Sequence, residues 1–133
     1  MKTILLFGRA EEVFNQELMQ FPVSWESSAS TKKGDRGLLY LIETGILYEW
    51  RAVEKGYENN EWVQKDKKWE YAADWEPVRT FSSPLTCAEM KRAFTFDEWP
   101  SVHQNLHYFP PREGHLILAD HVVKKLMPML DKL

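Results

Sequence analysis

The sequence predicts an α+β domain, with most strands in the first two thirds and most helices in the last third. Three observations support this class. Short apolar runs between turn residues recur from residue 2 to residue 81, helix-capping patterns cluster after Thr86, and 133 residues is the size of one domain. Because 44% of the residues are apolar, the chain can bury one core, and we expect a single domain over 1–133.

The N-terminal part predicts a buried strand and then a helix. Residues 2–7 contain the apolar run ILLF, which stops at a glycine. Residues 10–20 favour a helix, with Phe14 and Leu18 on one face. This helix must end before Pro22, because a residue that precedes proline is disfavoured in helical conformation.

A hairpin is predicted next. The turn at 32–35 leads into a strand at 38–42, Thr44-Gly45 forms the second turn, and residues 46–53 return. The polar stretch 55–68 is expected to be a loop.

Residues 69–81 resume strand character. Trp75, Val78 and Phe81 are the expected core contacts. Pro77 predicts an edge or a bulge, because proline cannot donate to a β-ladder.

Two capping boxes predict two short helices after this strand. Thr86 with Glu89, and Thr95 with Glu98, have the required spacing of three. Further on, residues 116–119 predict a final strand. The closing helix is expected to start at a cap on Asp120, to bury Val122, Val123, Leu126 and Met127, and to kink or end at Pro128.

Charge and cysteine content restrict the class of protein. The net charge of −3 argues against a protein that coats nucleic acid non-specifically, so any nucleic-acid contact should be local. The single cysteine, Cys87, excludes an intrachain disulfide, and we expect it to be a packing residue rather than a nucleophile. No apolar run approaches a secretory or membrane-spanning segment, so an intracellular, cytoplasmic location is expected.

Chemistry-bearing motifs are sparse. No glycine-rich phosphate loop occurs, which disfavours nucleotide hydrolysis. His103 and His107 are four apart, but nearby prolines interrupt a helix and no cysteine or carboxylate cluster completes a metal site, so no metal or cofactor is expected. Glu43 and Glu49 near the hairpin fit either a catalytic pair or a solvated sheet face.

The placement of three tryptophans is the most informative feature. Trp25 precedes a hydroxyl-rich run, whereas Trp62 and Trp69 flank the charged run VQKDKK. An indole in polar surroundings is either hidden by tertiary structure or held for a ligand, and for Trp25 both roles remain open. If the three meet, they form a cage for a methylated cation or an extruded base. The other tryptophans are expected in the core: Trp50, Trp75 and Trp99.

The order of these features resembles the YTH and EVE branches of the PUA-like superfamily. PVSWESSAS is similar to the Trp-x-Ser-Thr element of YTH domains. WVQKDKKW is similar to their Trp-Gln-Gln-Asp-Lys-Trp element, with two extra residues between the tryptophans. The ending LILADHVVKKL resembles that of EVE domains. The resemblance covers nearly the whole chain and implies a PUA-like mixed β-barrel or sheet flanked by short helices.

The resemblance also implies a function. YTH domains read N6-methyladenine in RNA through an aromatic cage, and EVE-type domains are associated with modified DNA as specificity modules of modification-dependent restriction systems. By this resemblance the chain is a non-enzymatic reader that flips N6-methyladenine or 5-methylcytosine, in DNA in preference to RNA, and works beside a motor or nuclease subunit in a defence system. YTH domains commonly place Lys-Ser-Tyr after the first strand, where this chain has Gly8-Arg9-Ala10, so the base identity stays open.

The implied site residues fall into two groups. The cage walls are Trp25, Trp62 and Trp69, with the backbone of Ser24 and Glu26 at the base edge. The residues expected to meet phosphates are Arg9, Lys65, Lys67 and Lys68.

Two alternatives remain. One is an ASCH-like enzyme or small-molecule binder, in which carboxylates such as Glu43 and Glu49 and lysines near the hairpin act on a nucleoside. The other is a protein-interaction domain whose exposed aromatic residues bury against a partner.

Overall fold

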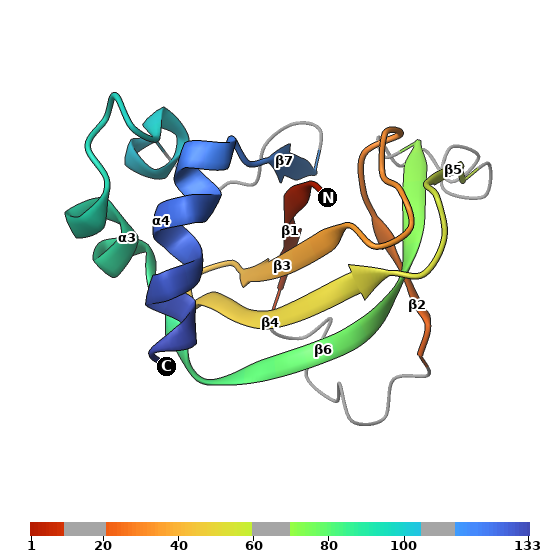
Figure 1. Ribbon diagram of the computed structural model, residues 1–133, viewed down its shortest axis with the longest axis horizontal. Helices are drawn as coiled ribbons and strands as arrows, with labels where there is room; N and C mark the ends of the chain where they lie inside the picture. The colour runs from red at the N-terminus through yellow and green to blue at the C-terminus, as the bar shows by residue number, and fades with distance from the viewer. Residues whose placement is uncertain (10–20, 60–69, 105–113) are drawn as a thin grey trace.

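The computed structural model describes residues 1–9, 21–59, 70–104 and 114–133 (Figure 1). Within these ranges one mixed sheet of seven strands packs against two α-helices and a 3-10 helix, so the α+β class is confirmed. The helix predicted at 10–20 lies outside the described residues. No helix in the described part of the chain combines the length and apolar character needed to cross a membrane.

The strands follow one another with few interruptions and the helices come late. The strands are β1 (Thr3–Gly8), β2 (Val23–Glu26), β3 (Arg36–Leu41), β4 (Gly45–Ala52), β5 (Tyr57–Glu58), β6 (Tyr71–Leu85) and β7 (His115–Ile117). The helices are α3 (Cys87–Ala93), the 3-10 helix η2 (Pro100–His103) and α4 (Asp120–Asp131). The sheet order is β2-β6-β4-β3-β1-β7, with β5 paired to β6. Only β1 and β3 run parallel among these strands.

Strand β1 is buried on both faces, as its continuous apolar sequence predicts. Leu5 and Phe7 belong to a core that the sheet shares with α3, η2 and α4. Ile4 and Leu6 belong to a second core on the other face, built around Trp50 and Trp75. Successive side chains of a strand point to opposite faces, so an uninterrupted apolar run satisfies both cores.

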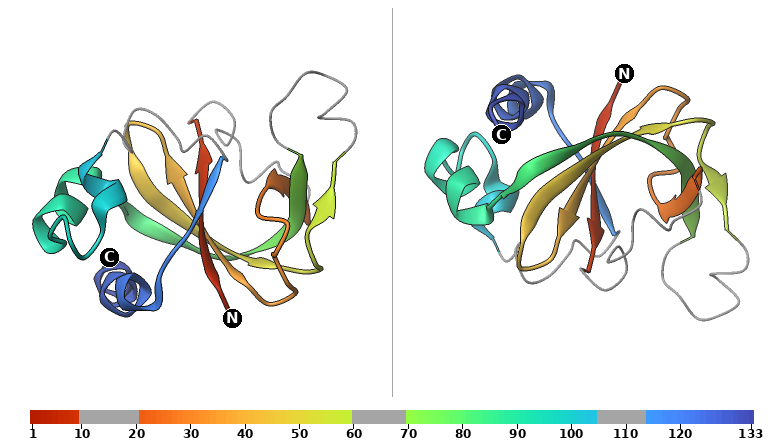
Figure 2. Two further views of the ribbon diagram at one scale, coloured as in Figure 1. Left: turned by 90° about the horizontal axis from the view of Figure 1, so that it is seen from above. Right: turned by 90° about the horizontal axis from the view of Figure 1, so that it is seen from below.

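The sheet curls until its two ends approach each other, as the views in Figure 2 show. Several contacts between described residues join the β2 end to the β1–β7 end. Trp25 Nε1 donates to the Phe7 carbonyl at 3.1 Å, and Glu26 Oε1 lies 2.8 Å from His115 Nδ1. Beyond β2, the Lys2 ammonium donates to the Ser30 carbonyl. We call this line of contacts the β2–β1 seam.

Both predicted turns are present. Asp35 N–H donates to the Lys32 carbonyl at 3.0 Å, which closes the turn at 32–35. The hairpin turn starts earlier than predicted, because Thr44 N–H donates to Leu41 and Glu43 adopts a φ of 67°. Gly45 has a φ of 132°, and a Cβ there would collide with the Leu85 carbonyl, so the position requires glycine.

Strand β6 runs to Leu85 rather than stopping at Phe81. Trp75 and Phe81 are buried as predicted, whereas Val78 is 41% exposed, so its assignment to the core was wrong. The β4–β6 register shifts between Glu49 and Trp50. This bulge lies beside Pro77, as the proline predicts, and it turns Val78 outward.

The two capping boxes have different outcomes. Glu89 N–H donates to Thr86 Oγ1 at 3.2 Å and α3 follows, as predicted. Thr95 and Glu98 also exchange hydrogen bonds, at 2.8 and 3.1 Å, but only a turn forms. The prediction of an α-helix there was wrong, because Pro100 disfavours helical geometry at the preceding residue. Cys87 is buried in the first core, as expected of a packing residue.

The last helix differs from its prediction at both ends. Ala119 is the N-cap of α4, so Asp120 is the first helical residue rather than the cap. The helix continues through Pro128 to Asp131, so the proline does not end it. Val122 and Leu126 are buried as predicted, which gives the helix its packed face.

Candidate nucleobase site

Trp25 lies at the β2–β1 seam and is partly buried against the second core. Its Nε1 hydrogen bond to the Phe7 carbonyl fixes one edge of the indole. Its ring meets the Trp50 ring edge-on, with centroids 5.6 Å apart and planes at 72°. Gly8 lies beneath it so closely that a Cβ there would be 2.8 Å from the Trp25 ring. Trp25 therefore has one orientation and keeps part of its surface open to solvent.

Trp25 rests on other aromatic side chains. Phe21 meets the same Trp50 ring edge-on at 6.1 Å. Trp50 and Trp75 are 0% exposed, and Trp99 is buried in the first core, so all three core predictions are confirmed. The indole N–H groups of Trp50 and Trp75 have no hydrogen-bond partner in the described ranges. Of the tryptophans that the structure describes, Trp25 is the one that is not fully buried.

Trp62 and Trp69 lie outside the described residues, and so do Lys65, Lys67 and Lys68. The residues on either side of this segment, Asn59 and Glu70, are joined by a 2.7 Å backbone hydrogen bond. Trp25 pairs with Ala73 on β6, three residues after Glu70. At about 3.3 Å per strand residue, both ends of the segment are held about 10 Å from the Trp25 backbone.

Ser24 and Glu26 flank Trp25 on β2, so their side chains point to the opposite side of the strand. Ser24 Oγ donates to Asp74 Oδ1 at 2.8 Å, and the Tyr57 hydroxyl donates to the same oxygen at 2.7 Å. Burial and the Asp74 carboxylate raise the pKa of Tyr57, against the opposing effect of its bond to Ser24. β2 is the last strand at its end of the sheet among the described strands.

The sequence matches no protein-family model and no curated protein. Solved structures do match it. Human THYN1 protein in complex with 5-methylcytosine-containing DNA has a TM-score of 0.67 at 15% identity, over 100% of this chain and 99% of that chain. The DUF55 domain of human thymocyte nuclear protein 1 also has a TM-score of 0.67, at 14% identity, over 97% and 98% of the two chains. A protein from Pseudomonas syringae has a TM-score of 0.71 at 14% identity, over 96% and 98%.

The chain has the PUA-like fold. The curled mixed sheet with flanking helices is the architecture that the resemblance implies, so that prediction is confirmed.

The Glu26 side chain helps to close the β2–β1 seam. Glu26 is buried and contacts His115 of β7 across the curl. Sequence reasoning missed this contact, since the two residues are 89 positions apart in the chain. Arg9, the first predicted phosphate contact, is exposed directly after β1.

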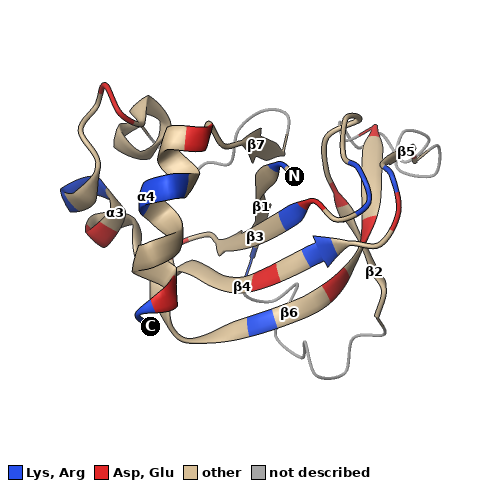
Figure 3. Cartoon of the chain, viewed as in Figure 1, with Lys and Arg blue, Asp and Glu red and all other residues tan. Residues whose placement is uncertain are grey.

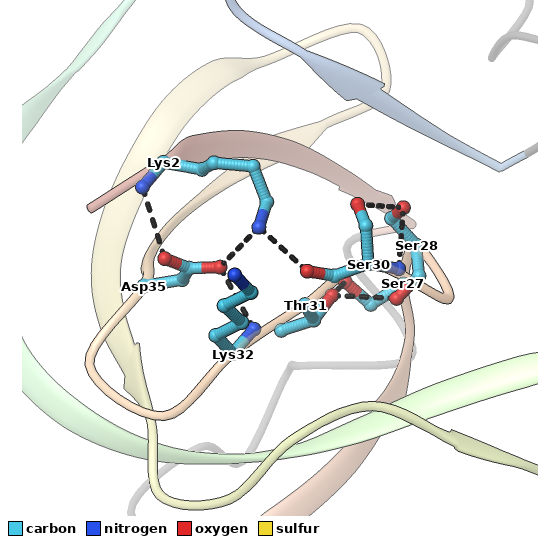
Figure 4. Close-up of polar contacts among 7 residues, drawn as sticks. All are labelled: Lys2, Ser27, Ser28, Ser30, Thr31, Lys32 and Asp35. Atoms are coloured by element: carbon cyan, nitrogen blue, oxygen red, sulfur yellow. Dashed lines mark hydrogen bonds and ion pairs between the residues drawn. The ribbon is translucent and has the colours of Figure 1, made fainter.

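The hydroxyl-rich run after Trp25 is folded upon itself rather than open to a ligand (Figure 4). Ser27 and Thr31 share a 2.8 Å hydrogen bond, and Thr31 Oγ1 donates to the Ser28 carbonyl at 2.7 Å. The Asp35 carboxylate accepts from the backbone N–H groups of Lys2 and Lys32, both at 2.9 Å. The loop is thereby a rigid connection between the seam and β3.

The fold separates the two carboxylates that were considered as a catalytic pair. Glu43 is exposed in the hairpin turn, whereas Glu49 is buried on β4. Glu49 lies 2.8 Å from Arg79 Nε and 3.5 Å from Arg36 Nε, so two guanidinium groups neutralise it. The predicted pair is therefore not formed. Among the described residues, no group of three or more His, Cys, Asp or Glu side chains is placed to hold a metal ion.

Proposed function

We propose that this PUA-like domain binds a methylated nucleobase, flipped out of nucleic acid and stacked against Trp25. The observation that best supports this proposal is that the Trp25 indole is fixed in place and still partly exposed. Trp25 is held by a hydrogen bond and by packing on Trp50, yet it retains open surface at the seam. A stacking surface that is already ordered loses little conformational entropy when a flat ligand arrives.

Stacking on one aromatic side chain is too weak to offset the cost of extruding a base from a duplex, so the proposed site needs more than one aromatic wall. Stacking on one aromatic side chain contributes about 1–3 kcal/mol, whereas unstacking a base from a duplex costs a few kcal/mol. Burying the added methyl group contributes about 0.8 kcal/mol, which corresponds to roughly fourfold discrimination. Trp62 and Trp69 are the proposed second and third walls, and they enclose the methyl group. The backbone of Ser24 and Glu26 is the proposed contact to the base edge.

The proposed ligand is DNA in preference to RNA, modified with N6-methyladenine or 5-methylcytosine. A domain of the same fold, aligned over the whole chain, is human THYN1 protein with 5-methylcytosine-containing DNA. Arg9, Lys65, Lys67 and Lys68 are the proposed phosphate contacts. With a net charge of −3 the domain binds locally and weakly alone, which suits an EVE-type specificity module without catalysis of its own. Its proposed partner is a motor or nuclease subunit of a restriction or defence system.

The test is fluorescence anisotropy with labelled oligonucleotides that differ only in one methyl group. Single- and double-stranded forms with 5-methylcytosine, N6-methyladenine or no modification are compared at one low salt concentration. We expect tighter binding of one methylated form, and a loss of about 5- to 150-fold in Trp25→Ala, Trp62→Ala and Trp69→Ala, the range for one stacking contact. Phe96→Ala is the matched control, because Phe96 is an aromatic residue 57% exposed beside the helices.

Trp25→Phe keeps an aromatic ring packed on Trp50 and Gly8 and removes the Nε1 hydrogen-bond donor. It therefore tests whether the loss of binding in Trp25→Ala reflects loss of the stacking ring or loss of the fold. Equal affinity of the wild-type domain for methylated and unmodified oligonucleotides would contradict the proposal. Turnover of a nucleoside would favour the ASCH-like alternative, and tryptophan effects seen only with a protein partner would favour the interaction domain.

A further inference from the structure

The part of the chain that the structure describes holds a cavity where the start of η2 meets the end of β7 and the first turn of α4. The volume of this cavity is about 150 Å³. An apolar cavity of roughly this size can hold one benzene ring. Ile117 is 44% exposed, so the cavity opens to solvent. Its apolar lining includes Trp99, Pro100, Leu116, Ile117, Leu118 and Val122.

The most exposed aromatic side chain among the described residues lies beside this cavity. Phe96 is 57% exposed and precedes Glu98, a lining residue, by two positions. Phe96 itself does not line the cavity, and its ring lies near the His103 ring, with centroids 6.4 Å apart. An exposed phenyl ring and an apolar cavity of benzene size therefore occur at the same end of the molecule. Burial of this ring would remove apolar surface from water, which favours association.

Two charges accompany the ring and the cavity. Asp97, the residue after the phenylalanine, is exposed. Lys124 is exposed on α4 three residues after His121, which lines the cavity, and positions three apart share one side of a helix. Neither charge forms an ion pair with any residue that the structure describes. Figure 3 shows the acidic turn before η2 and the basic turn of α4.

The neighbouring charged residues do not neutralise these two. Glu98 and Lys125 pair with each other at 3.1 Å. Asp120 precedes Lys124 by four positions, but no ion pair joins them among the described contacts. Asp120 lies in the first turn of α4, where the helix dipole favours an acidic side chain. The ring therefore has a negative charge beside it, and the cavity has a positive one.

A ring and a cavity at one end of the molecule are complementary in two copies of the chain. In a two-fold dimer the same surface is used twice, so a contact of one residue with another is accompanied by the reverse contact. Because Phe96 and the cavity lie at the same end, two copies can exchange rings at a single interface. Such a pair closes, whereas a ring and a cavity on opposite faces would build an open filament.

We propose that two copies of this chain form a two-fold dimer in which Phe96 of each copy enters the cavity of the other. In this dimer Asp97 lies near Lys124 of the other copy, so opposite charges border each ring. An interface built on two rings and two charge pairs is small, so we expect a weak and reversible dimer. The inference goes beyond base reading and does not depend on it.

The cavity and Trp25 lie at opposite ends of β1. Leu118 N–H donates to the carbonyl of Thr3, the first residue of β1, at 2.9 Å. Trp25 instead donates to the carbonyl of Phe7, near the last residue of the strand. Each copy in the dimer therefore keeps its own base-stacking surface. Phe96→Ala should leave the affinity for an oligonucleotide with one modified base unchanged.

Sedimentation equilibrium of the full chain, from about 1 µM to 1 mM, tests the dimer. We expect the wild type to change from monomer to dimer over this range. Phe96→Ala removes the ring and Ile117→Lys places a charge at the cavity, so each should weaken dimerisation by about tenfold or more. Both positions are exposed, and circular dichroism verifies that the variants are folded. Val78→Ala, at an apolar position 41% exposed on β6, is the matched control and should dimerise like the wild type.

A charge exchange tests whether the contacts join two copies. Asp97→Lys brings two cations together and Lys124→Glu brings two anions together, so each single variant should dimerise less than the wild type. In an equimolar mixture of the two variants, one copy of each restores opposite charges at both contacts. The mixture should therefore dimerise although neither variant does so alone.

Several results would overturn the dimer. They are a wild type that stays monomeric throughout the range, dimerisation that Phe96→Ala leaves unchanged, and a mixture that dimerises no better than its components. A monomeric wild type in which N-acetylphenylalanine amide shifts the amide resonances of Ile117 and Val122 would assign the cavity to an aromatic side chain of a different protein. Equal wild-type binding of methylated and unmodified oligonucleotides would overturn base reading instead, and it would leave the dimer standing.

Discussion

Gly8 is the residue at which a single added methyl group would displace Trp25. The Cβ of Gly8→Ala would lie 2.8 Å from the Trp25 ring, and the hydrogen bond to Phe7 limits how far the ring can move. We expect the free energy of unfolding to fall by about 1–3 kcal/mol, as in overpacked cores. Binding of the methylated oligonucleotide should weaken as well.

Urea unfolding and anisotropy measure these two effects. Ser83→Ala, at an exposed position near the end of β6, is the control and should change neither. Wild-type stability and affinity in Gly8→Ala would show that the indole orientation is not essential.

Asp35 is the residue whose ionisation most clearly links stability to pH. Burial acts to raise its pKa, but hydrogen bonds from the backbone of Lys32 and Lys2 and the Lys2 ammonium outweigh burial and lower it. A carboxyl group with a lowered folded-state pKa stabilises the protein above its unfolded-state pKa. This stabilisation is lost as the pH falls through the folded-state value, below the ordinary value of 3.8.

Asp35→Asn should therefore lower the free energy of unfolding by about 1–3 kcal/mol at pH 7, since two backbone donors lose a charged acceptor. The variant and the wild type should converge in stability as the pH falls below 3.8. Denaturant unfolding of the variant and the wild type at pH 7 and pH 3 measures these two effects. A difference in stability between the two proteins that is undiminished at pH 3 would contradict a lowered pKa for Asp35.

At the scale of elements, the two threonine caps make a matched comparison. Thr86 begins a seven-residue helix, whereas Thr95 begins only a turn. Thr86→Ala should cost about 1 kcal/mol, the usual value for an N-cap. Thr95→Ala should cost less, because its hydrogen bond organises fewer residues. Thermal unfolding gives the comparison, and an equal loss in both variants would refute it.

Secondary-structure elements that are specified by local sequence patterns could be predicted from the sequence. The apolar run of β1, the hairpin turn and the Thr86 cap are local patterns, and the structure has each of them. Val78 was misassigned because it is the extra residue of β6 at a register shift, between the partners of Glu49 and Trp50 on β4, and the sequence of β6 alone does not show this shift. The turn at Thr95 has the same capping pattern as Thr86, and only the later proline distinguishes them.

The candidate site could be predicted in part. The sequence identifies Trp25 as unusual but leaves its role open, because its exposure depends on how far the sheet curls. The Glu26–His115 contact and the buried environment of Glu49 arise from residues distant in the chain. The cage role of Trp62 and Trp69 remains a prediction from resemblance.

At the scale of the whole molecule, side-chain contacts from β2 to the β1–β7 end close the curl. The 2.8 Å contact between Glu26 and His115 joins β2 to β7, although these strands lie at opposite ends of the sheet order. His115→Ala should lower stability by about 1–3 kcal/mol, because the buried Glu26 carboxylate loses this partner. Local opening should concentrate at β2 and β7.

Hydrogen exchange measures that opening strand by strand. Amides of β2 and β7 should exchange faster in His115→Ala, whereas those of β3 and β4 should keep their protection. Lys124→Ala, at an exposed position on α4, is the control. Uniform acceleration over all strands would show that the seam does not open separately from the sheet.

The position of β1 has a consequence for how the chain reaches its native state. The strand at residues 3–8 pairs with β3 on one side and with β7, at residues 115–117, on the other. Its second partner emerges from the ribosome more than a hundred residues later, so the sheet is completed only after nearly the whole domain has been synthesised. Contacts between such distant residues slow folding, and we expect refolding within milliseconds to seconds, roughly the range of domains rich in non-local strand pairs. Until then one edge of an apolar strand stays open to pairing with other chains, so the time between synthesis and closure is when this protein is most exposed to aggregation.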